Sequence, residues 1–264
     1  MIKQILKDHA PGYKNEDLLA LYAITGGIPK YLELFCDNRA FTLQAMVEYA
    51  VRANSPLVDE GRNLLIEEFG KNHSTYFSIL EAISGGINTQ NAIEDLIGGK
   101  GIGGHLKRLQ EDYHVIERFR PIFSKEGTHS IKYEISDPFL KFWFRFLEKN
   151  RSMIEIGNYS LLRETILGQF HEYAGMLLER YFKQKLAESG EYAQIGSWWE
   201  PNKDQYQIDI VAIRAEKKCA DVIEVKRNKR SFRRGEFEAK ARHLQDKALP
   251  GYKVDAYCLG MEDM

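Results

Sequence analysis

Two acidic residues and a lysine near the C-terminus have the types and the spacing needed for chemistry on phosphate esters. Asp209 lies in the apolar run Gln207-Ile-Asp-Ile-Val-Ala-Ile, and Glu224 and Lys226 lie in Ala220-Asp-Val-Ile-Glu-Val-Lys. Carboxylates inside apolar strands cost free energy unless they are paired or bind a metal ion. A pair of carboxylates can hold Mg²⁺ or Mn²⁺, which polarises a phosphate and acidifies a bound water, while a lysine orients that water. These three residues therefore predict a catalytic site for metal-assisted phosphodiester hydrolysis, with both acids as metal ligands.

Strand geometry determines whether these side chains meet. Because side chains alternate along a strand, Glu224 and Lys226 share one face, and Asp209 comes within reach if the two strands pair. The alternative interpretation is an exposed sheet face with a cluster of charges, but the apolar flanks and the upstream acid favour a metal site. A further ligand is expected from the preceding helix, where Glu172 and Glu179 are about two turns apart and share a face.

The segment that carries these residues reads as an α/β domain. A long amphipathic helix is expected over residues 161–187, and a second helix over residues 235–247. Short strands are expected over residues 195–199, 207–213, 220–226 and 252–259. Antiparallel strands followed by a crossover helix and a last strand predict a mixed sheet.

A basic run follows the lysine directly. The sequence Lys226-Arg-Asn-Lys-Arg-Ser-Phe-Arg-Arg234 predicts contacts with a phosphate backbone, and a solvated loop is the alternative. The candidate nucleic-acid-binding residues of this run are Arg227, Arg230, Arg233 and Arg234.

The middle of the chain predicts a winged helix. Three short helices between about residues 72 and 112 precede two strands, which are separated by a polar loop at residues 121–130. In this arrangement the third helix enters the major groove of DNA. That helix carries His105, Lys107 and Arg108, and the wing carries Lys125, His129 and Lys132. Of these, Lys107, Arg108 and Lys132 are the candidate DNA contacts. Packing against a neighbouring domain or a partner protein remains open, because acidic residues are interspersed.

Residues 1–70 predict amphipathic helices, with a corner at Thr25-Gly-Gly-Ile-Pro-Lys30. Gly26 and Gly27 can end one helix, and Pro29 fits the first turn of the next. Further on, Gly98-Gly-Lys-Gly-Ile-Gly-Gly104 contains the spacing G-x-G-x-x-G, but it follows a helix and not a strand. It therefore predicts no dinucleotide site, and the chain contains no P-loop motif. The aromatic-rich helix that begins at Asp137 is expected to be interdomain core.

Composition narrows the class of protein. The chain has 44% hydrophobic and 28% charged residues and a net charge of −1, which is typical of a globular protein and identifies no partner. Three scattered cysteines fit a reducing cytoplasm better than a disulfide framework. Since no apolar run is long enough to span a bilayer or to serve as a signal peptide, a cytoplasmic location is expected.

Taken together, these motifs resemble a known family. Thr25-Gly-Gly-Ile-Pro-Lys-Tyr-Leu resembles the G-x-P region of the helical lid in archaeal-type AAA+/STAND ATPases, in which a winged helix follows. Gly196-Ser-Trp-Trp, Gln207-Ile-Asp-Ile-Val-Ala and Ile223-Glu-Val-Lys are similar to the C-terminal domain grouped with PD-(D/E)XK nucleases. The resemblance implies an α+β multidomain fold with an ATPase-lid-like segment at 1–70, a winged helix at 71–150 and a restriction-endonuclease-like domain at 151–264.

The resemblance also implies site residues and partners. Glu172, Asp209, Glu224 and Lys226 become the nuclease-like positions, Mg²⁺ or Mn²⁺ the cofactor, DNA the substrate, and Pro29 part of a nucleotide-sensing lid. Gln207 departs from the glutamate common in the family, and the P-loop core is missing. No ATPase activity is therefore expected from this chain alone. The alternatives are a catalytically silent module that binds DNA or protein, and a lid that contacts a nucleotide supplied by a separate ATPase chain.

Overall fold

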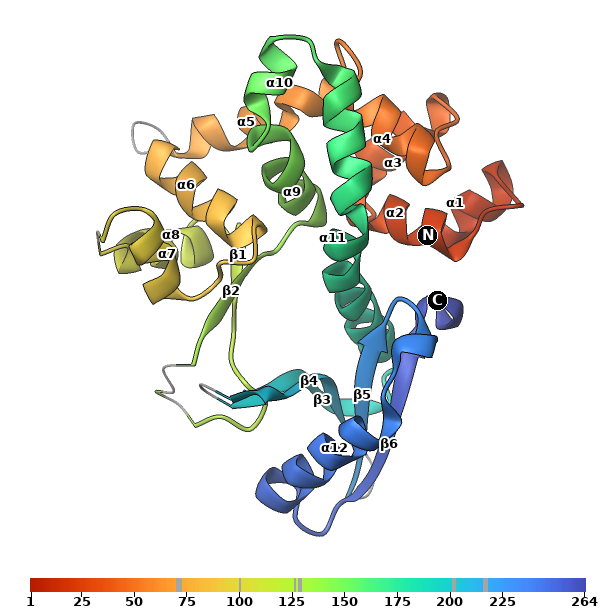
Figure 1. Ribbon diagram of the computed structural model, residues 1–264, viewed down its shortest axis with the longest axis vertical. Helices are drawn as coiled ribbons and strands as arrows, with labels where there is room; N and C mark the ends of the chain where they lie inside the picture. The colour runs from red at the N-terminus through yellow and green to blue at the C-terminus, as the bar shows by residue number, and fades with distance from the viewer. Residues whose placement is uncertain (70–72, 100, 126, 128–129, 201–202, 216–217) are drawn as a thin grey trace. The chain divides into compact units, whose positions relative to one another are not determined.

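The fold combines helices with two β-sheets (Figure 1). The computed structural model of the chain describes residues 1–69, 73–99, 101–125, 127, 130–200, 203–215 and 218–264. The chain divides into two compact units, which comprise Met1–Phe119 with Lys132–Ala174 and Arg120–Ile131 with Gly175–Met264. The predicted α+β class is confirmed, whereas the boundaries near residues 70 and 150 stay predictions.

The first unit begins with five helices. They are α1 (Ile2–His9), α2 (Asn15–Thr25), α3 (Pro29–Asp37), α4 (Leu43–Val51) and α5 (Pro56–Phe69). Gly26 follows α2 in a left-handed conformation with φ of 63°, which a glycine adopts without steric cost. Pro29 occupies the first turn of α3, where its missing N–H loses no helical hydrogen bond. The predicted corner between these helices is therefore present.

Three helices and a hairpin follow in the predicted order. They are α6 (His73–Ser84), α7 (Gln90–Leu96), α8 (Gly103–Glu111), β1 (Ile116–Phe119) and β2 (Lys132–Ile135). The two strands pair antiparallel, with Ile116 opposite Ile135. The glycine-rich turn lies between α7 and α8, so it follows a helix as expected, and its Lys100 lies outside the described residues. His129, predicted on the wing, also lies outside them.

Aromatic side chains form much of the core of the first unit. They come from α9 (Pro138–Phe142) and the π-helix η2 (Trp143–Glu148), which precede α10 (Arg151–Glu155). Phe139, Phe142, Trp143, Phe144 and Phe146 are fully buried. The indole Nε1 of Trp143 donates a hydrogen bond of 2.9 Å to the carbonyl oxygen of Val58 in α5. The aromatics are thus packing residues, as predicted.

The second unit contains a mixed four-stranded sheet. Its elements after α11 (Tyr159–Glu188) are β3 (Tyr192–Glu200), β4 (Lys203–Arg214), β5 (Cys219–Lys226), η3 (Lys229–Ser231), α12 (Arg234–Ala248), β6 (Lys253–Gly260) and η4 (Met261–Asp263). The strand order is β3-β4-β5-β6, in which only β5 and β6 are parallel (Figure 1). The α12 crossover makes that parallel pairing possible. The predicted mixed sheet is confirmed.

The core of the second unit lies between this sheet and α12. Phe237 and Leu244 of α12 pack with Ile208, Val211 and Val222 of the central strands. The loop between β1 and β2 also belongs here, because Ile122 joins the same core and its N–H donates 2.8 Å to the carbonyl oxygen of Ser197. This packing fixes the position of β4 and β5, which carry the acidic residues.

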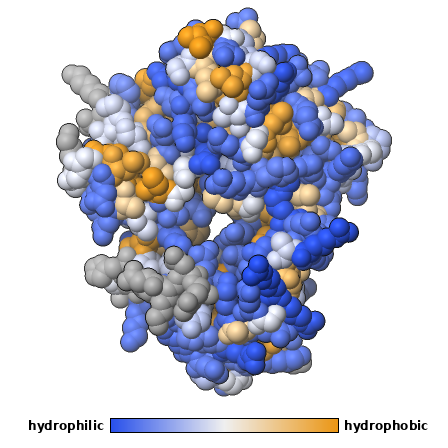
Figure 2. Space-filling view, viewed as in Figure 1, coloured by the Kyte–Doolittle hydropathy of each residue, from blue (hydrophilic) through white to orange (hydrophobic). Residues whose placement is uncertain are grey.

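The surface seen in Figure 2 is mostly hydrophilic, with hydrophobic residues in small scattered groups. Large exposed apolar side chains include Leu64, Leu96, Ile156 and Leu161. Among the helices as far as they are described, none has the length and hydropathy needed to cross a membrane.

Candidate functional site

The central strands bring three of the predicted site residues together. β4 and β5 pair antiparallel with Ile210 opposite Ile223, and Asp209 and Glu224 are the next residues of the two strands beyond this pair. Oδ2 of Asp209 accepts a hydrogen bond of 2.8 Å from the backbone N–H of Val225. Nζ of Lys226 lies 2.7 Å from Oε1 of Glu224. The two carboxylates and the ammonium therefore form one cluster at the end of β5.

The apolar sequence around the acids explains their burial. Ile208, Ile210 and Ile223 are fully buried, and Asp209 and Glu224 are each only 9% exposed. The pairing of β3 with β4 shifts by one residue between Gly196 and Trp198, next to Asp209. Such a bulge bends a strand locally and redirects its side chains. The irregularity lies beside Asp209, whose neighbours Ile208 and Val211 on β4 both pack in the core.

Burial also sets the charge state of Asp209. Burial raises the pKa of its carboxyl, and the charge of Glu224 raises it further. The N–H of Val225 and the ammonium groups of Lys226 and Lys183 act in the opposite direction, but the pKa stays above its ordinary value. The cluster therefore favours either a proton or a bound cation at Asp209.

The same cluster changes the pKa of Lys226. Burial lowers the pKa of its ammonium group, but the hydrogen bond and charge of Glu224 and the charge of Asp209 outweigh burial and raise the pKa overall. Lys226 is thus a firmly charged donor, held in place by Glu224.

Lys183 and Ser197 belong to the cluster, and sequence reasoning missed both. Nζ of Lys183 in α11 donates 2.6 Å to Oγ of Ser197, which donates 2.8 Å to the carbonyl oxygen of Asp209. A lysine on an amphipathic helix breaks no apolar pattern, so the sequence gives no signal for Lys183. Ser197 lies in the motif Gly196-Ser-Trp-Trp, which was noticed only as part of a resemblance.

Glu172 lies elsewhere in the fold. It belongs to the part of α11 in the first unit, its side chain is 77% exposed, and its Oε1 lies 3.6 Å from Nη2 of Arg145. The acidic cluster belongs to the second unit, as does Glu179. The structure therefore does not place Glu172 in one compact unit with Asp209 and Glu224, and its role as a metal ligand stays a prediction.

The acidic pair can be compared with the needs of a divalent cation. No group of three Asp, Glu, His or Cys side chains suited to a metal ion occurs in the described part of the chain. Mg²⁺, however, is often held by one or two carboxylates, together with water and substrate phosphates. Hydrogen bonds from described residues engage Oδ2 of Asp209 and Oε1 of Glu224 and leave the other oxygen of each carboxylate. The remaining carboxylate oxygens of Asp209 and Glu224 therefore fit a Mg²⁺ ion that is held by two carboxylates and completed by water and phosphate.

The basic run after β5 is exposed but partly neutralised. Arg233 lies 3.1 Å from Glu236, and Arg234 lies 2.7 Å from Glu238. Arg230, in η3, is also exposed, whereas Arg227 is half-buried. These arginines lie directly after the strand that carries Glu224 and Lys226, as predicted from the sequence.

The candidate DNA contacts of the first unit lie on α8 and β2. Lys107 and Arg108 are both exposed on α8, and Nζ of Lys107 lies 3.7 Å from Glu111. Lys132 is half-buried at the start of β2. The helix thus presents two cationic side chains to solvent, and their contact with DNA stays a prediction.

Comparisons with known proteins relate the chain to archaeal and bacterial proteins. Residues 143–239 match the family DUF234, described as archaea bacterial proteins of unknown function. An uncharacterized protein of Methanocaldococcus jannaschii is 29% identical over 237 residues, which cover 84% of this chain and 50% of that protein. The chain thus spans about half the length of this relative. No solved structure matches the chain. The family match begins at the π-helix and includes Asp209, Glu224 and Lys226.

Proposed function

We propose that the second unit is a metal-dependent phosphodiester hydrolase of the PD-(D/E)XK nuclease type that acts on DNA. The observation that carries the proposal is the convergence of Asp209, in the middle of β4, with Glu224 and Lys226 at the end of the paired strand β5. Their burial supports it, because buried carboxylates are retained where they are paired or bind a cation.

Each residue has a distinct role in this proposal. A Mg²⁺ or Mn²⁺ ion between Asp209 and Glu224 would polarise the phosphate and acidify a water. Lys226, fixed by Glu224, orients the attacking water and stabilises the negative charge that develops on the phosphate. The Lys183–Ser197 chain holds the backbone of Asp209 at the site.

The rest of the chain supplies DNA binding and control in the same proposal. Residues 71–150 act as a winged helix, with Lys107, Arg108 and Lys132 on phosphates, and Arg227, Arg230, Arg233 and Arg234 guide DNA beside the cluster. Residues 1–70 act as an ATPase-lid-like segment that couples this module to an ATPase core, in the cytoplasm. The three-helix and hairpin order supports the winged helix.

The test is DNA cleavage by the purified chain. Single-stranded and double-stranded DNA are incubated with Mg²⁺, with Mn²⁺ or with a chelator. We expect cleavage only with metal, and a loss of at least about 100-fold for Glu224→Gln, because the negative charge and one of the two carboxylate oxygens are removed. Glu188→Gln, an exposed change of the same kind on α11, is the matched control. Metal-independent cleavage, or full activity of Glu224→Gln, would overturn the proposal.

A second candidate is a silent module that binds DNA or protein. The ion pair between Lys226 and Glu224, together with the raised pKa of Asp209, favours it, because the cluster reaches near-neutrality without a metal ion. Under this alternative DNA binding weakens with salt but needs no Mg²⁺. Calorimetric titration of the chain with Mn²⁺ separates the two candidates, since saturable binding that Glu224→Gln abolishes contradicts the silent module.

A further inference from the structure

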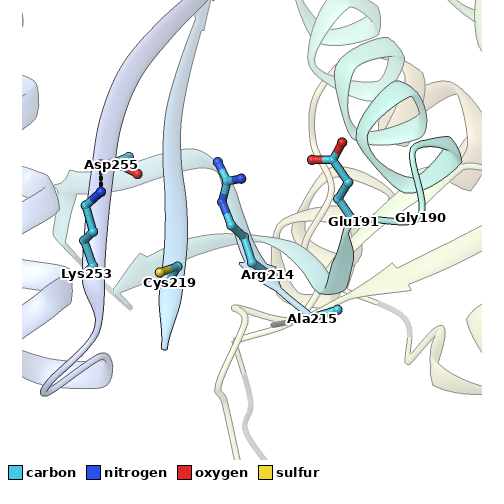
Figure 3. A pocket seen from close by; sticks show the side chains of 7 residues that line it. All are labelled: Gly190, Glu191, Arg214, Ala215, Cys219, Lys253 and Asp255. Carbon is cyan, nitrogen blue, oxygen red and sulfur yellow. Dashed lines mark ion pairs between the residues drawn. The ribbon is translucent and has the colours of Figure 1, made fainter. Parts of the chain in front are cut away.

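A pocket lies at the opposite end of β5 from the acidic cluster. Its volume is about 530 Å³, and it is lined by Gly190, Glu191, Arg214, Ala215, Cys219, Lys253 and Asp255 (Figure 3). Cys219 begins β5, whereas Glu224 is five residues further along it, which is about 17 Å at the rise of an extended strand. The pocket is therefore separate from the proposed hydrolase site.

A buried network fixes the arginine of this pocket. Nη2 of Arg214 donates 2.9 Å to each carboxylate oxygen of Asp221, which is fully buried. The hydroxyl of Tyr192 donates a further hydrogen bond of 2.5 Å to Oδ2 of Asp221. Nη2 makes both of these bonds, and within the described residues no hydrogen bond is made by Nε or Nη1, so their donors can meet another partner. A planar fork held in this way is suited to a carboxylate.

An acidic side chain faces the same pocket without neutralising this arginine. Glu191 is exposed, and no ion pair joins it to Arg214 or to any other cation within the described ranges. Figure 3 shows the side chains of Arg214 and Glu191 extending to the same side of the sheet. Lys253 and Asp255, in contrast, lie 3.8 Å apart and offset each other's charge. The pocket thus offers the remaining guanidinium donors of Arg214, whose charge is paired with Asp221, and the carboxylate of Glu191, which has no ion pair among the described residues.

We propose that this pocket binds a small zwitterion of the amino-acid type, with its carboxylate on Arg214 and its ammonium group on Glu191. Both side chains line one cavity, and the remaining guanidinium donors of Arg214 suit a carboxylate while the carboxylate of Glu191 suits an ammonium group, which matches a ligand that carries both charges. Neither DNA nor a metal ion takes part, so the site is independent of the proposed hydrolase activity.

The test is a titration of the ¹⁵N-labelled full chain with glycine, alanine and γ-aminobutyrate, which differ in the spacing of their charges. Acetate and ethylammonium serve as probes with a single charge. We expect saturable shifts of the Gly190 and Ala215 amides with at least one zwitterion, and a Kd at least about tenfold lower than that of either single-charge probe. Absence of saturation with all three zwitterions, or equal binding of acetate, would overturn the proposal.

Variants locate the binding. Glu191→Gln and Arg214→Lys should each raise the Kd by about tenfold or more, because each removes a charge-assisted contact or the planar fork. Glu191 is exposed, so its replacement leaves the fold intact. Glu188→Gln, which makes the same change three residues away on α11, should leave the Kd unaltered. A Kd unaffected by Glu191→Gln would contradict the assignment.

Discussion

The buried carboxyl of Asp209 predicts a dependence of stability on pH. Its pKa is raised in the folded state, chiefly by burial, above the ordinary value of 3.8 expected in the unfolded chain. Below the ordinary value both states are protonated and no penalty arises. As the pH rises through the folded pKa, the unfolded state releases its proton first, so stability is lost. At neutral pH the raised pKa of Asp209 in the folded state therefore lowers the free energy of unfolding.

Asp209→Asn should raise the free energy of unfolding at pH 7, because an amide keeps an acceptor for the Val225 N–H without the buried charge. The gain should shrink as the pH falls towards 3.8. Urea unfolding at several pH values measures the gain in the free energy of unfolding at pH 7 and its decrease at lower pH. Asp246→Asn, an exposed change on α12, is the control and should show no such trend. A loss of stability at pH 7 would mean that the charge of Asp209 is stabilised by its lysine neighbours.

The Arg214–Asp221 pair predicts a larger effect. Arg214→Met leaves the fully buried Asp221 without its cation, which should cost about 3 kcal/mol of stability. The double variant Arg214→Met with Asp221→Asn should recover most of this loss, because no buried charge remains. Thermal or urea unfolding of the unsubstituted protein, the two single variants Arg214→Met and Asp221→Asn, and the double variant measures the coupling. If the double variant is no more stable than Arg214→Met, the loss comes from packing and not from the unpaired carboxylate.

Only part of the residue-scale site could be predicted from the sequence. Asp209 and Glu224 interrupt apolar strands, and this local signal identified them. Asp221 also interrupts β5, the strand of Glu224, and its side chain is fully buried. The sequence nevertheless gave no reason to assign it a role. Its partners Arg214 and Tyr192 come from other strands. Lys183 and Ser197 join the site through strand and helix packing, which no spacing along the chain reveals.

At the scale of elements, the contact between α5 and η2 predicts a steric effect. Gly61 lies within α5, where alanine would normally be favoured by about 1 kcal/mol. A β-carbon at Gly61, however, would overlap the indole ring of Trp143, which is fully buried. Gly61→Ala should therefore destabilise the protein by about 1–3 kcal/mol, as overpacking of a close-packed core does. Thermal unfolding measures the change.

The same substitution on α11 is the control. A β-carbon at Gly168 would meet no atom within 4 Å, so Gly168→Ala should stabilise the chain by about 0.5–1 kcal/mol. If Gly61→Ala destabilises the protein and Gly168→Ala stabilises it, the loss at Gly61 comes from the contact with the indole ring. Stabilisation by both would mean that Trp143 moves aside readily.

Helices and strands were largely predictable because their apolar periodicity is local. The mixed sheet, the crossover helix and the corner at Pro29 all follow from such patterns. The π-helix at Trp143–Glu148 was not predicted, since its aromatic and aliphatic residues have the spacing of an ordinary helix. Its wider turn depends on tertiary packing of large side chains, which sequence spacing does not encode.

At the scale of the whole chain, the assignment of segments to compact units depends on tertiary contacts. The sequence predicted three consecutive domains, and the structure shows two units whose segments interleave. Arg120–Ile131 joins the second unit because Ile122 packs with its core and the Trp199 indole donates 2.7 Å to Oγ of Ser130. A polar loop between two strands gives no sign of such a partner.

Each unit carries candidate basic residues for the proposed DNA binding, and salt dependence tells whether either set contacts DNA. Each phosphate contact that is removed lowers the slope of log K against log salt by about 1. If both surfaces bind, the paired variants Lys107→Gln with Arg108→Gln and Arg230→Gln with Arg233→Gln should each lower the slope by about 2. Fluorescence anisotropy with a labelled duplex at several salt concentrations measures the slopes.

A matched pair of charge changes outside both surfaces completes this test. Lys7→Gln with Lys149→Gln removes the same charge from two exposed positions, so it separates specific contacts from the effect of net charge. If only the variant Lys107→Gln with Arg108→Gln lowers the salt slope, DNA binding is assigned to α8 of the first unit. That result would contradict the role of the arginines beside the acidic cluster. A reduction confined to the Arg230 pair would contradict the winged-helix role. Equal slopes for all variants and the control would show that neither surface holds the phosphate backbone, and the DNA-binding part of the proposed function would then be wrong.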